Sequence, residues 1–90
     1  MNVLLKNSPF TIIDVGTPDE FAKGHVPGAL NFPLDEIPYR VSELREMPRP
    51  IIAYCRSGNR GHVAISLLKQ EGVEEVYNGG GLHDMLRSAQ

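Results

Sequence analysis

The sequence contains a single cysteine among its 90 residues, so the chain cannot form an intramolecular disulfide. The domain must therefore be stable without such a cross-link, which suits a reducing compartment. No apolar run approaches the ~20 residues that a membrane-spanning helix needs. The apolar residues 3–5 are too few for the core of a secretory signal, and no positively charged start precedes them. We expect a cytoplasmic protein without membrane contact, or a mature form whose signal was removed.

A surplus of positive charge is also absent. Nine Lys and Arg face eleven Asp and Glu, for a net charge of -2, whereas a general nucleic-acid binder usually carries a basic surplus. The three histidines and the cysteine lack any zinc-ligand spacing. The glycine-rich residues 78–81 lack the lysine of a Walker motif. We therefore expect neither a nucleic-acid partner nor a metal site, although a local basic pocket remains compatible with this net charge.

Strand and helix signals alternate along the chain, which predicts one α/β domain over residues 1–90. Short, β-branched apolar runs predict strands at residues 10–15, 30–32, 50–54 and 73–77. Apolar spacings of three and four, with start and stop signals, predict helices at residues 17–24, 34–44 and 60–71 and a short last helix from residue 82. This alternation favours a largely parallel central sheet with helices on both faces.

Some of these elements carry more detailed expectations. Thr17 and Glu20 have the spacing of a capping box at a helix start, and Pro38 is expected to divide the helix in which it lies. Residues 78–81 (Asn-Gly-Gly-Gly) are expected to form a flexible turn. The helix at residues 60–71 is predicted to bury a stripe formed by Val63, Ala64, Leu67 and Leu68.

Most of the chemical information lies in residues 51–62, where an apolar strand ends at Cys55 and a polar loop leads into a helix. In open α/β sheets, sites form beyond the carboxyl ends of strands. Small residues let a loop point several backbone N–H groups inward, and such a nest at a helix N-terminus binds anions. Arg56 and Arg60 add positive charge. Together these features predict a reactive Cys55 with a lowered pKa, rather than an inert buried thiol.

No general base is evident beside Cys55. His62 is near in sequence but falls within the helix start, where we expect it to be exposed. The loop itself should therefore stabilise charge through N–H groups and arginines. That arrangement suits transfer of a group with its own anionic charge, and the residues alone leave both sulfane sulfur and phosphoryl groups open.

Three segments resemble the rhodanese (sulfurtransferase) family. The resembling residues are Asp14-Val15, Glu20-Phe21, 24–29 and 31–33 for the N-terminal signature, 55–60 for the active-site loop, and 76–78 with 80–81 for the closing strand and turn. They occur in the family's order and cover nearly the whole chain. The resemblance implies a small three-layer domain with a largely parallel central sheet flanked by helices.

The resemblance also implies an activity, in which Cys55 carries a persulfide between a donor such as thiosulfate and a thiophilic acceptor. The acceptor would be a thiol or another protein, and the family typically needs no metal or organic cofactor. Backbone amides of the loop would cradle the persulfide, and its two arginine side chains would attract the anionic donor. The implied substrate-binding residues are Arg56, Ser57, Gly58, Asn59 and Arg60.

Two alternatives stay open beside the sulfurtransferase. Phosphatases related to the resembling family have a loop one residue longer than the six residues 55–60, so loop length favours sulfur. A non-catalytic module that binds proteins is the other alternative, and such modules often lack the cysteine. The chain departs from the family pattern at Gly16, usually arginine, at Gly61, commonly serine, and at Met85, usually tryptophan. We expect Gly61 to weaken the helix start.

Single polar residues outside the loop carry smaller expectations. Asp14, the acid in the first strand, is expected to bond nearby backbone at the strand end, with a role in shaping the site as the alternative. His25 is expected to tie its Pro-Gly turn to neighbouring chain, and His83 to be exposed.

Overall fold

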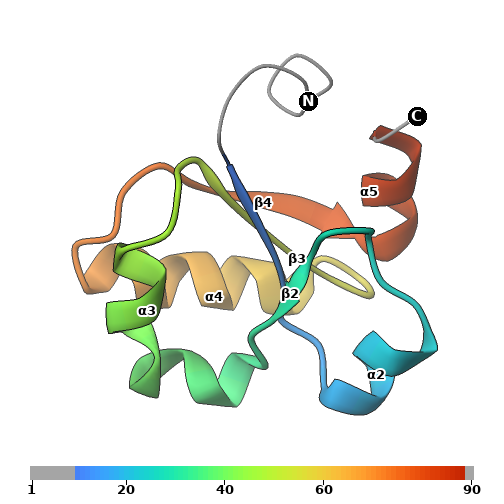
Figure 1. Cartoon of the computed structure of the whole chain (residues 1–90), viewed down its shortest axis with the longest axis horizontal. Coiled ribbons are helices and arrows are strands. Elements are labelled where there is room, and N and C mark those ends of the chain that lie inside the picture. Colours follow the sequence, from blue (N-terminus) through green and yellow to red (C-terminus); the bar gives the residue numbers. More distant parts are fainter. Residues whose placement is uncertain (1–9, 89–90) are drawn as a thin grey trace.

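The structure, a computed structural model, describes residues 10–88 and is built on a sheet of four parallel strands in the order β2-β1-β3-β4 (Figure 1). The strands are β1 (Thr11–Asp14), β2 (Leu30–Asn31), β3 (Ile51–Cys55) and β4 (Val76–Gly81). The helices are α2 (Pro18–Lys23), the 3₁₀ helix η1 (Leu34–Tyr39), α3 (Val41–Arg45), α4 (Asn59–Gln70) and α5 (Leu82–Ser88). The predicted alternation of strands and helices and the parallel sheet are confirmed.

Local sequence signals place two of the helix boundaries. At the start of α2, Thr17 Oγ1 accepts from Glu20 N at 3.2 Å, and Glu20 Oε1 accepts from Thr17 N at 2.9 Å, which completes the predicted capping box. Pro38 lies inside η1, and the chain resumes as an α-helix only at Val41. The helix predicted over residues 34–44 is thus divided, as expected, but at Arg40, two residues after Pro38. A proline ring clashes with the preceding turn of an α-helix.

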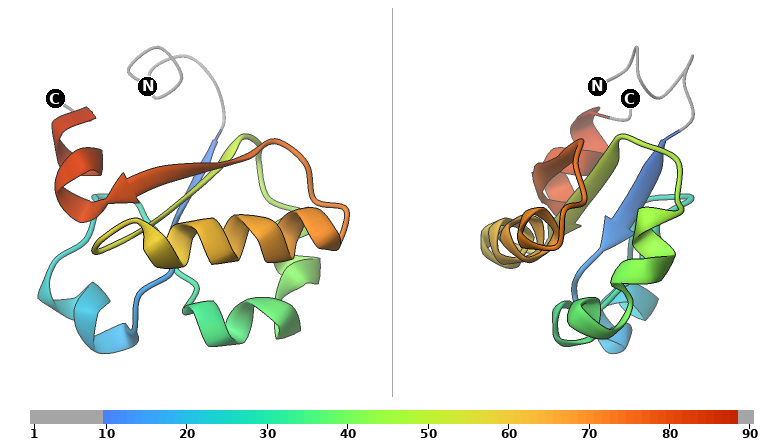
Figure 2. Two further views of the ribbon diagram at one scale, coloured as in Figure 1. Left: turned by 180° about the vertical axis from the view of Figure 1, so that it is seen from behind. Right: turned by 90° about the vertical axis from the view of Figure 1, so that its left-hand side faces the viewer.

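The sheet is buried on both faces, which gives three layers. Alternate side chains of β3 point to opposite sides, since the period of a strand is two. Ile51, Ala53 and Cys55 face η1, α3 and α4, whereas Ile52 and Tyr54 face the layer that includes α5. Helices α4 and η1 lie side by side beneath the sheet (Figure 2). No helix within residues 10–88 is long and apolar enough to cross a membrane.

The prediction of a flexible turn at residues 78–81 was wrong, because these residues form the last four positions of β4. Ala53 pairs with Asn78 and Tyr54 with Gly80, so Gly79 is the extra residue of a β-bulge. The glycines allow close packing: a Cβ on Gly81 would lie 2.5 Å from Arg56 O, and one on Gly79 would overlap Met85. Tertiary packing, rather than a turn, therefore explains this glycine run.

The predicted buried stripe of α4 needs one correction. Ala64 and Leu68 are fully buried, and Leu67 is half-buried against the same core, but Val63 is 49% exposed. Gly61 is buried instead, and Ile65 packs against the core beside Leu67. The helix is therefore rotated so that its inner face runs through Gly61, Ala64 and Leu68.

This correction leads to a paired stability test on one helix. Leu68→Ala should lower the free energy of unfolding by about 2–5 kcal/mol, because it removes buried methyl groups and leaves a cavity. Val63→Ala should change it by less than about 0.5 kcal/mol, as expected for an exposed helix position. Urea unfolding followed by circular dichroism measures both values, and equal losses in the two variants would contradict the assigned face of α4.

Candidate active site

Cys55 is the last residue of β3, and its side chain is fully buried beneath the loop that leads into α4. The amide of Gly58 donates to Cys55 Sγ at 2.9 Å. Burial opposes ionisation of this thiol, but hydrogen bonds from the amides of Gly61, Gly58, Ser57 and Arg60 outweigh it and lower the pKa of Cys55. The loop thus presents backbone N–H groups to the sulfur, as the sequence predicted.

The loop can turn toward the sulfur because Gly58 adopts a left-handed conformation. Its φ is 95° and its ψ is -16°, a region that residues with a Cβ enter at a cost. Gly58 is also the N-cap of α4, so the helix begins directly beneath the sulfur. The unpaired N–H groups of a helix N-terminus carry partial positive charge, which favours an anion there. His62 is exposed on α4, as expected.

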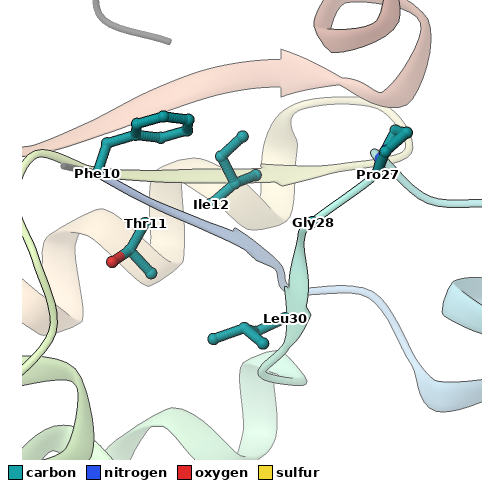
Figure 3. Close-up of a pocket in the computed structure, with 6 residues that line it drawn as sticks. All are labelled: Phe10, Thr11, Ile12, Pro27, Gly28 and Leu30. Atoms are coloured by element: carbon teal, nitrogen blue, oxygen red, sulfur yellow. The ribbon is translucent and has the colours of Figure 1, made fainter. Parts of the chain in front are cut away.

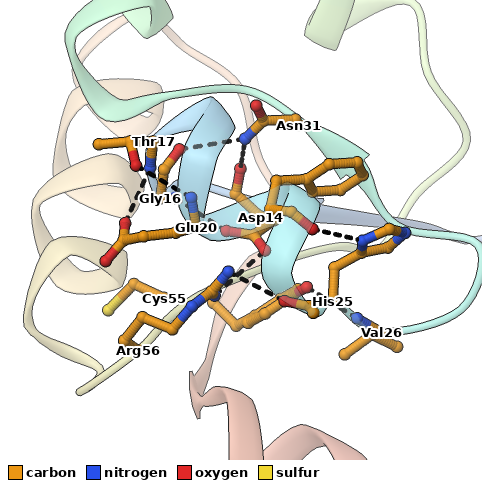
Figure 4. A network of polar contacts seen from close by, with 12 residues as sticks. Asp14, Gly16, Thr17, Glu20, His25, Val26, Asn31, Cys55 and Arg56 are labelled. Atoms are coloured by element: carbon orange, nitrogen blue, oxygen red, sulfur yellow. Dashed lines mark hydrogen bonds and ion pairs between the residues drawn. The ribbon is translucent and has the colours of Figure 1, made fainter.

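Arg56 anchors the first half of the loop to β1. Its Nη1 donates to Asp14 Oδ2 at 3.2 Å and its Nη2 to Gly24 O at 3.1 Å (Figure 4). Asp14 is completely buried, and its Oδ1 accepts from Gly16 N at 2.8 Å. Asp14 therefore bonds nearby backbone, as predicted, and also holds Arg56. The ion pair and the amide together compensate a carboxylate that would be costly to bury alone.

Arg60 anchors the second half of the loop to α2. Its Nη1 and Nη2 donate to the two carboxylate oxygens of Glu20 at 2.7 and 3.0 Å. The bond to Arg60, followed by the one from Thr17 N, lowers the pKa of Glu20 from 4.5 to about 2. The same pairing raises the pKa of Arg60. The sequence indicated Glu20 as a capping residue and as part of the N-terminal signature, but it did not reveal the contact of Glu20 with the loop.

Both arginines of the loop are thus paired with carboxylates, and this changes the electrostatics expected of the site. The side chains of Arg56 and Arg60 keep 24% and 34% of their surface exposed, so part of each side chain is accessible to a bound anion. The carboxylates offset part of the attraction that the two arginines exert on an anion. The backbone amides of the loop attract an anion without such an offset. Ser57 and Asn59 lie exposed at the rim of the loop.

In the described part of the chain, one cleft beside the sheet touches the loop and another lies away from it. A cleft of about 420 Å³ between the end of β1 and the start of η1 has Arg60 in its wall, with Val15, Gly16, Thr17, Pro33, Leu34 and Asp35. The other, of about 230 Å³, lies where β1 begins (Figure 3). It is lined by Phe10, Thr11, Ile12, Pro27, Gly28 and Leu30, none of which belongs to the loop.

The remaining histidines lie as the sequence predicted. The ring of His25 stacks on Phe21 with 3.7 Å between centroids, and its Nδ1 lies 2.8 Å from Phe21 O. It ties the turn before β2 to helix α2, outside the loop. His83 is exposed on α5. Within residues 10–88, no three His, Cys, Asp or Glu side chains gather as a metal site would require.

Comparison with known proteins identifies the family. The model of the rhodanese-like domain family matches residues 2–85, so this chain belongs to that family. It is 42% identical over 67 residues to a sulfurtransferase of Allochromatium vinosum, covering 74% of this chain and 62% of the relative. It is 34% identical over 74 residues to the thiosulfate sulfurtransferase PspE of Escherichia coli, covering 81% of this chain and 71% of the relative.

Solved structures agree with the fold. A rhodanese with anions from E. coli superposes with a TM-score of 0.74 at 32% identity, covering 82% of this chain and 88% of that one. The human single-domain sulfurtransferase TSTD1 gives a TM-score of 0.80 at 25% identity, covering 98% and 90%. The chain nevertheless spans less than two thirds of the length of several curated relatives, for example 52% of YqhL of Bacillus subtilis.

The amides around Cys55 predict a thiol that ionises more readily in the folded than in the unfolded protein. The pH midpoint of iodoacetamide alkylation should be lower for the native protein than for the same protein in urea, where the thiol titrates at ~8.5. Native-state rates should be compared by their pH dependence, since burial slows the absolute rate. A native midpoint at or above the unfolded one would contradict the assigned role of the amides.

The ion pair between Glu20 and Arg60 predicts a specific acid sensitivity. The pKa of Glu20 is lowered in the folded state, so the stabilisation is fully present above about pH 4.5 and is lost as the pH falls toward about 2. Urea unfolding at a series of pH values should show a steeper loss of stability over this window in the native protein than in Glu20→Gln. Parallel pH curves for the two proteins would show that this pair contributes nothing measurable.

Proposed function

We propose that this protein is a sulfurtransferase that moves sulfane sulfur from an anionic donor such as thiosulfate to a thiophilic acceptor through a persulfide on Cys55. The observation that carries the proposal is a buried sulfur at a strand end on which several backbone amides converge. Such amides are already oriented before the reaction, so they stabilise developing negative charge without reorganising. The sulfurtransferase names of the relatives support the same class of reaction.

In the first step, the thiolate of Cys55 attacks the outer sulfur of thiosulfate. A new S–S bond forms, the bond to the sulfonate sulfur breaks, and sulfite leaves with the bonding electron pair. The product is a persulfide anion on Cys55, with its terminal sulfur in the loop. The loop amides and the exposed parts of Arg56 and Arg60 would hold the negative charge of donor and product.

In the second step, a nucleophilic acceptor attacks the terminal sulfur. The acceptor is cyanide in an assay, or a thiolate of a small molecule or protein. The S–S bond to Cys55 breaks, the thiolate of Cys55 leaves with the electron pair, and the amides again receive it. A lowered thiol pKa helps both steps, because the thiolate is the nucleophile in the first and the leaving group in the second.

The persulfide is testable by mass spectrometry of the intact protein. After incubation with thiosulfate and removal of excess donor, the mass should rise by one sulfur atom, and treatment with cyanide should remove it. Cys55→Ser should show no gain, because no other cysteine is present in the chain. Cys55 lies inside the fold, so circular dichroism of the variant provides the control for folding.

Other outcomes would replace the proposal. No mass gain with any sulfane sulfur donor would reject it. Turnover of an aryl phosphate with inhibition by vanadate would indicate a phosphatase. Absence of both activities, together with a protein partner retained by Cys55→Ala, would indicate a binding module.

A further inference from the structure

Asn78 connects strand β4 to the cysteine loop, and nothing in the proposed chemistry requires it to touch the substrate. Its Nδ2 donates to Gly58 O at 3.1 Å, and its Oδ1 accepts from Gly80 N at 2.8 Å. The two partners have opposite polarity, so they fix which way the amide points. The side chain is half-buried between the strand and the loop.

The β-bulge in β4 explains how a strand side chain reaches this loop. Bulges re-aim side chains, and this one lies between the pairs Ala53–Asn78 and Tyr54–Gly80. The bond from Gly80 N to Asn78 Oδ1 spans the bulge. Nδ2 is then directed at the carbonyl of Gly58, the residue whose own amide lies 2.9 Å from Cys55 Sγ.

Gly61 makes room for this arrangement. A Cβ at position 61 would lie 2.6 Å from Asn78 Oδ1 and 3.2 Å from Asn78 Cγ. A side chain at position 61 and Asn78 in its present position therefore exclude each other. Gly61 also supplies one of the amides that act on Cys55, so the two residues belong to one arrangement around the sulfur.

We propose that Asn78 is a positioning residue that holds the cysteine loop with its amides directed at Cys55, and that glycine at position 61 provides the space that Asn78 needs. On this view, Gly61 does not simply weaken the start of α4. Its lack of a side chain leaves the space occupied by Asn78, which lies three residues before the end of β4. A part in sulfur transfer rests on the proposed function, whereas the effect on the thiol of Cys55 does not.

A comparison of two asparagine variants separates positioning from general stability. Asn78→Ala removes both bonds and should raise the alkylation midpoint of Cys55 by about half a unit to one unit, because the amides lose their alignment. Asn31→Ala is the matched control. Asn31 Nδ2 also makes two bonds to backbone, with Asp14 O and Gly16 O at 3.0 Å each, but neither lies in the cysteine loop. In Asn31→Ala, the alkylation midpoint of Cys55 should stay unchanged, although the loss of stability should be similar to that in Asn78→Ala.

A double-mutant cycle tests the coupling of the two positions. Gly61→Ala keeps its amide and suits a helix, so the variant should fold even if Asn78→Ala does not. Alone, Gly61→Ala should displace Asn78 and raise the alkylation midpoint of Cys55 as Asn78→Ala does. In the Asn78→Ala background, Gly61→Ala should raise this midpoint little further.

Three outcomes would overturn the proposal: no shift in Gly61→Ala, full additivity of the two changes, or an equal shift in Asn31→Ala. Alkylation reports on the loop whether or not the protein transfers sulfur. Failure of this proposal is therefore distinguishable from failure of the proposed function, which the persulfide mass tests.

Discussion

The structure depends on one constraint, which is that a sulfur buried at the end of β3 must face backbone N–H groups. This requires the chain to reverse immediately after Cys55, which the left-handed Gly58 permits. It also requires β4 to pack tightly against the loop. A Cβ on Gly81 would lie only 2.5 Å from Arg56 O, so glycine at this contact lets the two backbones approach more closely than a side chain would allow.

Two ion pairs hold the cysteine loop in place. Arg56 and Arg60 each pair with a carboxylate, one from β1 and one from α2, so the loop is attached on both sides of its glycine. The carboxylates offset part of the positive charge of the two arginines, and oriented amides of the loop add to the favourable environment for an anion. Preorganised dipoles of this kind need no rearrangement as charge moves, and they function well away from bulk water.

Much of the fold could be predicted from local sequence. Signals spanning a few residues predict the capping box of Thr17 and Glu20, the helix break near Pro38 and the alternation of strands and helices. The errors have a common cause. The glycine run of β4 is typical of a turn when it is read locally. In the structure, small residues are needed there because the loop and Met85 pack against them. Val63 has the right spacing for a buried stripe, but the orientation of α4 leaves it exposed.

The sequence by itself determined the cysteine at a strand end, the short loop after it and the helix that follows this loop, because those features depend on adjacent residues. Tertiary structure alone decided the partners. Asp14 and Glu20 meet the loop arginines across 42 and 40 positions, and Asn78 reaches Gly58 across 20. No periodicity encodes such contacts, because they depend on strand order, on the bulge and on the space at Gly61. Packing therefore decided how the loop is held and aimed at Cys55.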